Sequence, residues 1–184
     1  MQSLDPECEC NEYTQMASLT EEMLSTLGFD IVDPGFIDTP HRVASFWLEF
    51  TQRSEPEIRT FPSNSTSLVR LENYETWGLC PHHLLPVKYS IDICYTPCGT
   101  VFGISKLPRI ADYCLRTLPL QEDLPKQIVE FITSKLDVNY AQCTVRGMHL
   151  CMVMRGVRAR DCELTTSYET YGPTSDCTPY CMED

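Results

Sequence analysis

The segment GLCPHHLLP brings together side chains that can hold a metal ion. Two residues lie between Cys80 and His83, and thiolate and imidazole are ligands that zinc prefers. A second thiol, Cys151, lies close to His149 in the segment HLCMVMRGV. A zinc ion held by Cys80, His83 and Cys151 would keep one position for water. His82 and His149 would then be free to transfer protons beside the metal.

The second metal-binding segment is predicted to be a strand, in which alternate side chains point to the same face. One face would carry the possible site residues: His149, Cys151, Val153 and Arg155. The other face would belong to the core: Leu150, Met152 and Met154. The alternative interpretation is that the thiols are merely buried and the histidines are satisfied polar residues. Cys8 and Cys10 are a further candidate pair of thiol ligands.

Two other segments carry groups suited to a phosphorylated ligand. Ser105, Lys106 and Arg109 lie in FGISKLPRI, where a strand is expected to pass into a helix whose free N–H groups attract anions. Gln121 and Glu122 begin the next predicted helix. A solvated basic turn and ordinary acidic residues at a helix start are the alternative interpretations of these two segments.

Composition limits the class of protein. The chain has 184 residues, which predicts one domain with a helical appendage, and a net charge of −12, which argues against nucleic-acid binding. Four cations in one short span predict a pocket for a small anion: Arg146, Arg155, Arg158 and Arg160. The eleven cysteines, without an export signal, predict free thiols in the cytoplasm. No apolar run is long enough to predict a membrane span.

These residues must be positioned by elements that the hydrophobic pattern predicts. Thr39 is expected to cap a helix in which Pro40 is the first residue. Helices are expected at 14–27, 41–50, 105–118 and 121–136, and strands at 67–77, 86–97, 101–105, 140–154 and 157–168. The order predicts an α+β fold, in which an antiparallel sheet carries two helices on one face.

The motifs LCPHHLLP, FGISKLPRI, LQEDLPKQI, HLCMVMRGV and TTS, preceded by DTPHRVA, resemble the GTP cyclohydrolase I family over residues 15–168. The resemblance implies the tunnelling fold, β-β-α-α-β-β, preceded by N-terminal helices. It divides the chain into an N-terminal helical region and connector (1–66), a catalytic domain (67–170) and a divergent C-terminal tail (171–184). Pro81 and Gly78 depart from the family pattern, which commonly has Glu and Ser at these positions.

The resemblance also implies a role for each site residue. Zinc would be held by Cys80, His83 and Cys151, and protons would be handled by His82 and His149. The guanine base would be bound by Gln121 and Glu122. The triphosphate would be bound by Arg42, Ser105, Lys106, Arg109 and Arg155.

The implied reaction is the zinc-dependent conversion of GTP to 7,8-dihydroneopterin triphosphate and formate, through opening of the guanine imidazole ring and rearrangement of the ribose. The product leads to folate, biopterin or 7-deazaguanine bases. The implied assembly is a homo-oligomer, most often a decamer, with sites between subunits. Two alternatives are a zinc- and purine-binding module without turnover and a related enzyme of 7-deazaguanine synthesis.

Overall fold

The computed structural model describes residues 6–172, with side chains from residue 11 onward. The chain divides into two units between Gln52 and Arg53, and each unit is described by itself. The domain boundaries predicted at residues 66 and 170 stay predictions. Most of the predicted C-terminal tail, including residues 173–184, lies outside the described residues.

The first unit consists of two helices, α1 (Pro6–Thr26) and α2 (Thr39–Thr51), which pack on each other. The rings of Tyr13 and His41 stack between them, with centroids 5.7 Å apart. The prediction that Thr39 caps α2 is wrong, because the cap residue is Asp38. Pro40 is therefore the second residue of α2, not the first as predicted. It still lies in the first turn, where backbone N–H groups have no partner within the helix, so its missing N–H costs no hydrogen bond.

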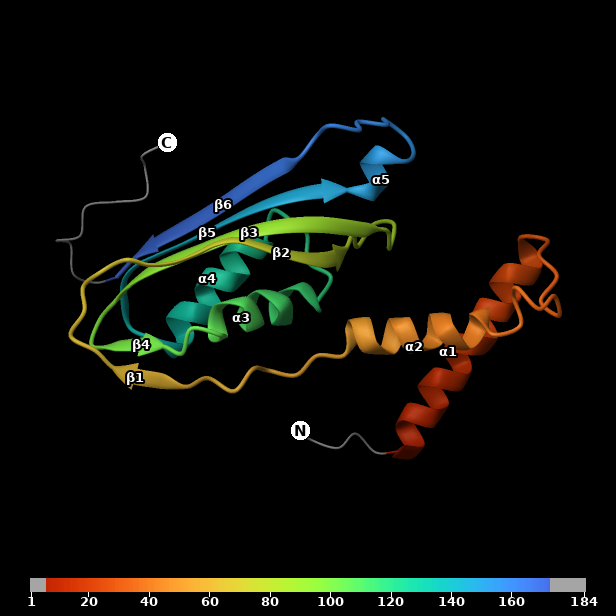
Figure 1. The fold of residues 1–184 in the computed structure, drawn as a ribbon, viewed down its shortest axis with the longest axis horizontal. Helices are drawn as coiled ribbons and strands as arrows, with labels where there is room; N and C mark the ends of the chain where they lie inside the picture. The colour runs from red at the N-terminus through yellow and green to blue at the C-terminus, as the bar shows by residue number, and fades with distance from the viewer. Residues whose placement is uncertain (1–5, 173–184) are drawn as a thin grey trace. The chain divides into compact units, whose positions relative to one another are not determined.

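The second unit is built on an antiparallel sheet (Figure 1). Its strands lie in the order β2-β3-β5-β6. Their bounds are Val69–Leu79, Pro86–Pro97, Val138–His149 and Leu164–Tyr171. A separate pair of short strands, β1 (Thr60–Pro62) and β4 (Thr100–Phe102), lies beside the sheet. The strand predicted at 101–105 corresponds to β4. The observed strand starts one residue earlier and is shorter than predicted.

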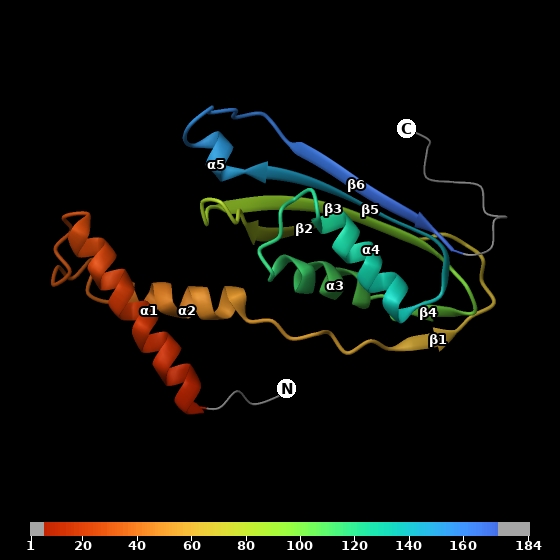
Figure 2. The ribbon, with the colours of Figure 1, turned by 180° about the vertical axis from the view of Figure 1, so that it is seen from behind.

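Two helices, α3 (Lys106–Leu115) and α4 (Leu124–Lys135), cover one face of the sheet, as the front and back views show (Figures 1 and 2). The element order β2-β3-α3-α4-β5-β6 confirms the predicted α+β arrangement of the tunnelling fold. Ile91 and Ile93, at alternate positions of β3, share one core with side chains of the helices, and all five residues are fully buried: Ile91, Ile93, Ile110 of α3, and Ile128 and Ile132 of α4. This core fixes the sheet as a rigid base for its ends.

The strand predicted at 140–154 is wrong beyond His149, where β5 ends and a short helix, α5 (Leu150–Val153), begins. The last pair of the ladder joins Val87 to His149, and the preceding residue of β3 is Pro86, which has no N–H to extend the ladder. The predicted core residues of this segment are also wrong, since Leu150 and Met152 are only partly buried and Met154 is 62% exposed.

The last strand also begins later than predicted. After α5 the chain turns sharply, with positive φ at Gly156 (59°) and Arg158 (52°), and Ala159 N–H donates to Met152 O at 2.9 Å. The strand predicted at 157–168 is therefore β6, Leu164–Tyr171, which pairs with β5 from Gly147 to Tyr140. The turn and α5 connect β5 to β6 in a segment where the sequence pattern predicted strands.

Candidate active site

A group of three possible metal ligands lies where the strands end. Cys80 directly follows β2, His149 closes β5, and Cys151 lies in α5. One ligand atom from each of these residues lies within 4.8 Å of the other two. The register that pairs Leu79 with Pro86 and Val87 with His149 brings these strand ends together.

The turn between β2 and β3 brings two imidazoles to the first thiol. Leu84 N–H donates to Cys80 O at 2.8 Å, and Cys80 N–H donates to Leu85 O at 2.9 Å. Leu84 has a φ of 54°, a strained value for a non-glycine residue that often marks functional turns. The Nδ1 atoms of His82 and His83 each lie 3.7 Å from Cys80 Sγ.

The donor set fits a zinc ion. Cys80 is buried and Cys151 is half-buried, and burial together with the neighbouring Cys80 raises the pKa of the Cys151 thiol. A bound cation reverses this effect, because a coordinating thiol is deprotonated. The compact three-residue group contains His149, while His83 contacts Cys80 from the turn. The structure therefore brings three imidazoles to the thiols: His82 and His83 beside Cys80, and His149 beside both Cys80 and Cys151.

His149 is held from one side by Gln121. Its Nε2 lies 2.6 Å from Gln121 Oε1, and the Gln121 Nε2 donates to Leu164 O at 2.6 Å. Gln121 is only 3% exposed, an unusual degree of burial for a glutamine. Burial lowers the pKa of the His149 imidazole, an effect that the nearby Glu122 carboxylate opposes and the His82 charge reinforces.

Tyr89 is a site residue that the sequence analysis missed. It lies fully buried on β3, and its ring meets the His149 ring edge to face, with centroids 6.2 Å apart. Burial raises the pKa of its hydroxyl far above the ordinary value, and the charges of Cys80 and Glu122 add to this effect. The alternation of β3 contained the signal, because Tyr89 shares the buried face with Val87 next to the histidine turn.

The predicted triphosphate residues are not all brought together. Ser105, Lys106 and Arg109 lie at the start of α3, whose Lys106 N–H donates to Gly103 O beside the β1–β4 pair. Tyr95 also belongs to this end, since its hydroxyl accepts from Phe102 N–H at 3.0 Å.

The group of three possible metal ligands lies at the opposite end of β3 from Tyr95. Val87, beside the ligand group, and Tyr95 are eight positions apart along β3. At about 3.3 Å per residue this is a distance of about 26 Å. Figure 1 shows α3 starting beside β4 and running toward the end of β2. One copy of the chain therefore does not unite the start of α3 with the thiols.

The other predicted substrate residues differ in their positions. Arg155 follows α5 closely, is exposed, and its charge acts on the Cys151 thiol. Glu122 is exposed and its charge acts on His149. Arg42 lies in the first unit, where it pairs with Asp38 at 3.2 Å. Cys8 and Cys10 fall in a part of α1 whose side chains are not described.

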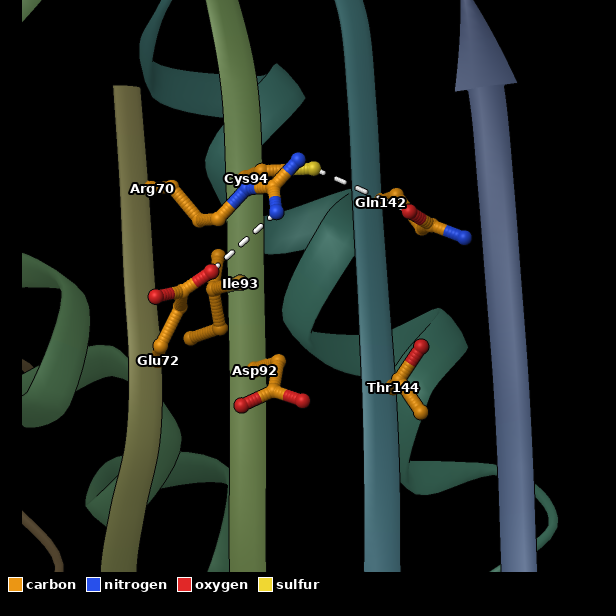
Figure 3. Close-up of a pocket in the computed structure, with 7 residues that line it drawn as sticks. All are labelled: Arg70, Glu72, Asp92, Ile93, Cys94, Gln142 and Thr144. Atoms are coloured by element: carbon orange, nitrogen blue, oxygen red, sulfur yellow. Dashed lines mark hydrogen bonds and ion pairs between the residues drawn. The ribbon is translucent and has the colours of Figure 1, made fainter. Parts of the chain in front are cut away.

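A hollow, called the mid-sheet hollow below, lies in the middle of the sheet on the face away from the helices (Figure 3). It measures about 160 Å³, and strand residues line it: Arg70, Glu72, Asp92, Ile93, Cys94, Gln142 and Thr144. Arg70 pairs with Glu72 at 3.1 Å, and Asp92 pairs with Arg146 at 2.7 Å. Charges in this hollow thus neutralise one another.

An antiparallel sheet backed by helices, with two thiols and imidazoles converging at one end, defines a candidate metal-dependent enzyme. The profile of the family described as GTP cyclohydrolase I matches residues 16–176 of the chain. The chain therefore belongs to the GTP cyclohydrolase I family. No helix within residues 6–172 is long and apolar enough to cross a membrane.

Individual relatives agree with this family. The chain is 37% identical over 158 residues to a GTP cyclohydrolase 1 of Leptospira biflexa, which covers 83% of this chain and 86% of the relative. It is 32% identical over 161 residues to a GTP cyclohydrolase 1 of Methylococcus capsulatus, covering 84% and 87% respectively. A solved archaeosine synthase QueF-like structure in the apo form shares 20% identity with a TM-score of 0.47, covering 59% of this chain and 98% of its own.

Proposed function

We propose that this protein is a zinc-dependent hydrolase that converts GTP to 7,8-dihydroneopterin triphosphate and formate. The observation that carries the proposal is the group of thiols and imidazole formed by Cys80, His149 and Cys151 in a chain of the GTP cyclohydrolase I family. Opening the guanine imidazole ring consumes one water and release of formate consumes a second. Closure of the rearranged ribose onto the freed amines returns one water.

Cys80, His83 and Cys151 are proposed to hold the zinc ion. Support comes from the nearness of the buried Cys80 thiol to the half-buried Cys151 thiol, and from the His83 Nδ1 atom 3.7 Å from Cys80 Sγ. When bound, zinc supplies Lewis acidity that activates water for hydrolysis near neutral pH. Pro81 stiffens the turn that carries two of these ligands, since its ring fixes φ.

Proton transfer is assigned to His82 and His149. The His82 Nδ1 lies 3.7 Å from Cys80 Sγ, and His149 belongs to the compact ligand group, so both rings lie beside the proposed reacting centre. One ring protonates an imidazole nitrogen of the guanine as the ring opens, and protons must later reach the freed amines. Imidazole suits both tasks because it accepts and donates protons near neutral pH.

Recognition of the guanine base is assigned to Glu122, with Gln121 beside it. A carboxylate accepts hydrogen bonds from adjacent N–H groups, which guanine presents on its pyrimidine edge. The exposed position of Glu122, close enough to influence both His149 and Tyr89, supports this role. The base would then lie against the histidines with its imidazole ring toward the zinc position.

Binding of the triphosphate is assigned to Arg42, Ser105, Lys106, Arg109 and Arg155. Among those of these residues that lie in the second unit, Arg155 belongs to the same end of the sheet as the thiols. The separation of about 26 Å along β3 between the thiols and the start of α3 supports a site built from more than one copy of the chain. We therefore propose a homo-oligomer, a decamer in its full form, in which neighbouring copies complete each site.

We place the reaction in the cytoplasm. Both proposed thiol ligands, Cys80 and Cys151, are free thiols. A reducing compartment keeps such thiols available for a metal. The proposed product, a pterin triphosphate, belongs to pterin biosynthesis, whose later branches include tetrahydrofolate and, from the same first step, modified 7-deazaguanine bases.

The test is an assay of purified, zinc-loaded protein with GTP. The proposal expects stoichiometric formate and, after oxidation, a fluorescent pterin. Binding of GTP without either product would favour a purine-binding module. Consumption of a nitrile substrate with NADPH, through a cysteine and without zinc, would instead favour an enzyme of 7-deazaguanine synthesis.

A further inference from the structure

The hydrogen bonds of Gln121 fix which of its side-chain atoms faces His149. Gln121 Nε2 lies 2.6 Å from Leu164 O and 3.4 Å from Val145 O. Carbonyl oxygens only accept, so this end of the amide must be the NH₂ group. The atom 2.6 Å from His149 Nε2 is consequently the amide oxygen.

That orientation determines the tautomer of the histidine. An amide oxygen has no hydrogen to donate, so His149 must carry a hydrogen on Nε2. In the neutral ring the lone pair then resides on Nδ1. The partner that binds the second nitrogen of a histidine commonly sets this choice in metal and catalytic sites.

The backbone around Gln121 makes this orientation hard to change. Thr166 Oγ1 donates to Gln121 O at 3.1 Å, so the residue is tied to β6 through its main chain as well as its side chain. Gln121 lies just before α4 and contacts both β5 and β6. Its side-chain amide is therefore fixed by two strands, β5 and β6, which is the arrangement expected of a group that orients another.

Two glycines leave the space that the contacts on His149 require. A Cβ on Gly147 would overlap Gln121 Oε1 and come within 3.0 Å of Tyr89 Cε1. A Cβ on Gly78 would come within 2.6 Å of Tyr89 Cε2. The Tyr89 ring therefore fills the space between two glycines on the neighbouring strands and meets the His149 ring edge to face.

We propose that Gln121 and Tyr89 are positioning residues that hold His149 as its Nε2–H tautomer, with Gly147 leaving the space for both. The consequence for catalysis, which rests on the proposed function, is that neutral His149 accepts a proton only at Nδ1. Gln121 then acts on the histidine and leaves recognition of the guanine base to Glu122.

The direct test is solid-state NMR of the sedimented full-length protein, metal-free and labelled with ¹⁵N-histidine, at pH 8. The chain has four histidines, and the His149 signals are assigned by their loss in His149→Ala. The expected result is a protonated Nε2 and an unprotonated Nδ1. A protonated Nδ1 with a bare Nε2 would overturn the proposal, whether or not the protein turns over GTP.

Gln121→Leu separates positioning from substrate binding. Leucine has similar volume but no hydrogen bonds, so the single tautomer is expected to give way to a mixture. Turnover of GTP should fall about tenfold or more, while KM changes less than about threefold. A large rise in KM with the Nε2–H tautomer intact would assign Gln121 to the base and overturn the proposal.

Two further variants complete the design. Gln142→Leu is the matched control, because this glutamine lies on β5 in the mid-sheet hollow, where it contacts Cys94 (Figure 3). It is expected to leave the His149 tautomer and turnover unchanged. Gly147→Ala should displace the Gln121 oxygen without removing it and give the same mixture of tautomers. A single Nε2–H tautomer in Gly147→Ala would contradict the assigned use of this space.

Discussion

The mid-sheet hollow and the thiol end of the sheet use the same strands in different ways. In the mid-sheet hollow, neighbouring strands present charged side chains side by side, and Arg70 pairs with Glu72 (Figure 3). Asp92 pairs with Arg146. At the sheet end the ladder stops at Pro86, and residues from turns and a short helix converge. There the thiols and imidazoles face one another rather than opposite charges.

The difference shows why chemistry is expected at the thiol end of the sheet and not in the mid-sheet hollow. Charged groups that already pair with each other across the strands have little left to offer a ligand. Turns at the end of a rigid sheet can aim unlike groups at one point without breaking the sheet itself. Substitutions at the thiol end of the sheet should therefore change activity or ligand binding, whereas substitutions in the mid-sheet hollow should change only stability, and by less.

The largest difference is expected from His149→Ala. Loss of a proton-transferring side chain should lower turnover of GTP by about 10²–10⁴-fold, while zinc stays bound through its three proposed ligands, Cys80, His83 and Cys151. Steady-state rates and zinc content of the same sample measure both effects. Thr144→Ala in the mid-sheet hollow is the control and should keep nearly full activity. Loss of zinc from His149→Ala would make this histidine a ligand.

Mixing inactive variants tests whether two copies complete a site. His149→Ala and Lys106→Ala proteins, mixed equally and allowed to exchange subunits, should recover activity at about a quarter of their sites if neighbouring chains supply the two residues. His149→Ala mixed with Arg155→Ala should recover none, because both residues belong to the same end of one chain. Full activity of a monomer in light scattering would refute the shared site.

A smaller effect is expected for base recognition. Glu122→Gln removes a charged hydrogen-bond acceptor and should weaken GTP binding by roughly 1.5–3 kcal/mol. Calorimetry on a turnover-deficient background gives this affinity directly. Glu72→Gln provides the matched control in the mid-sheet hollow and should bind GTP as the parent does. If both variants bind GTP with equal affinity, Glu122 does not recognise the base and is an ordinary acidic residue at the start of a helix.

The smallest effect concerns the stability of the mid-sheet hollow. Burial raises the pKa of Asp92, but hydrogen bonds from Arg146 and from Asn73 N–H outweigh it and hold that pKa below its ordinary value. The carboxylate thus stabilises the fold above about pH 4, and this contribution is lost as the pH falls through the lowered pKa.

Thermal unfolding of Asp92→Asn measures that contribution. At pH 7 the variant should be less stable than the parent by about 1 kcal/mol or less, the usual range for a partly exposed ion pair. The gap should narrow as the pH falls from 7 toward the lowered pKa of Asp92, because the carboxylate's contribution to the parent's stability is lost on protonation. A gap that stays constant from pH 7 to pH 3 would contradict the role of the charge.

Much of the fold could be predicted because its signals are local. The alternation of β3 gave its bounds, and the early prolines of α3 and α4 were compatible with their first turns. The end of β5 could not be predicted this way, since HLCMVM continues the strand alternation. The strand stops because its neighbour begins at Pro86, and that pairing is a property of the assembled sheet.

The candidate site shows the same division. Cys151 was proposed as a ligand on the argument that it shares a strand face with His149, yet it approaches that histidine from α5. The bond between Gln121 and His149 joins residues that are 28 positions apart, and no periodicity in the sequence signals it. Residue types indicated the chemistry, whereas the pairing of side chains required the fold.

The most direct test of the account is the zinc content of three purified proteins. The parent is expected to bind one zinc per subunit, and Cys151→Ser is expected to lose it, because a hydroxyl is a far poorer zinc ligand than a thiolate. Cys162→Ser, at an exposed cysteine after α5, should keep full zinc. Full zinc occupancy in Cys151→Ser would contradict the proposed metal site at the end of the sheet.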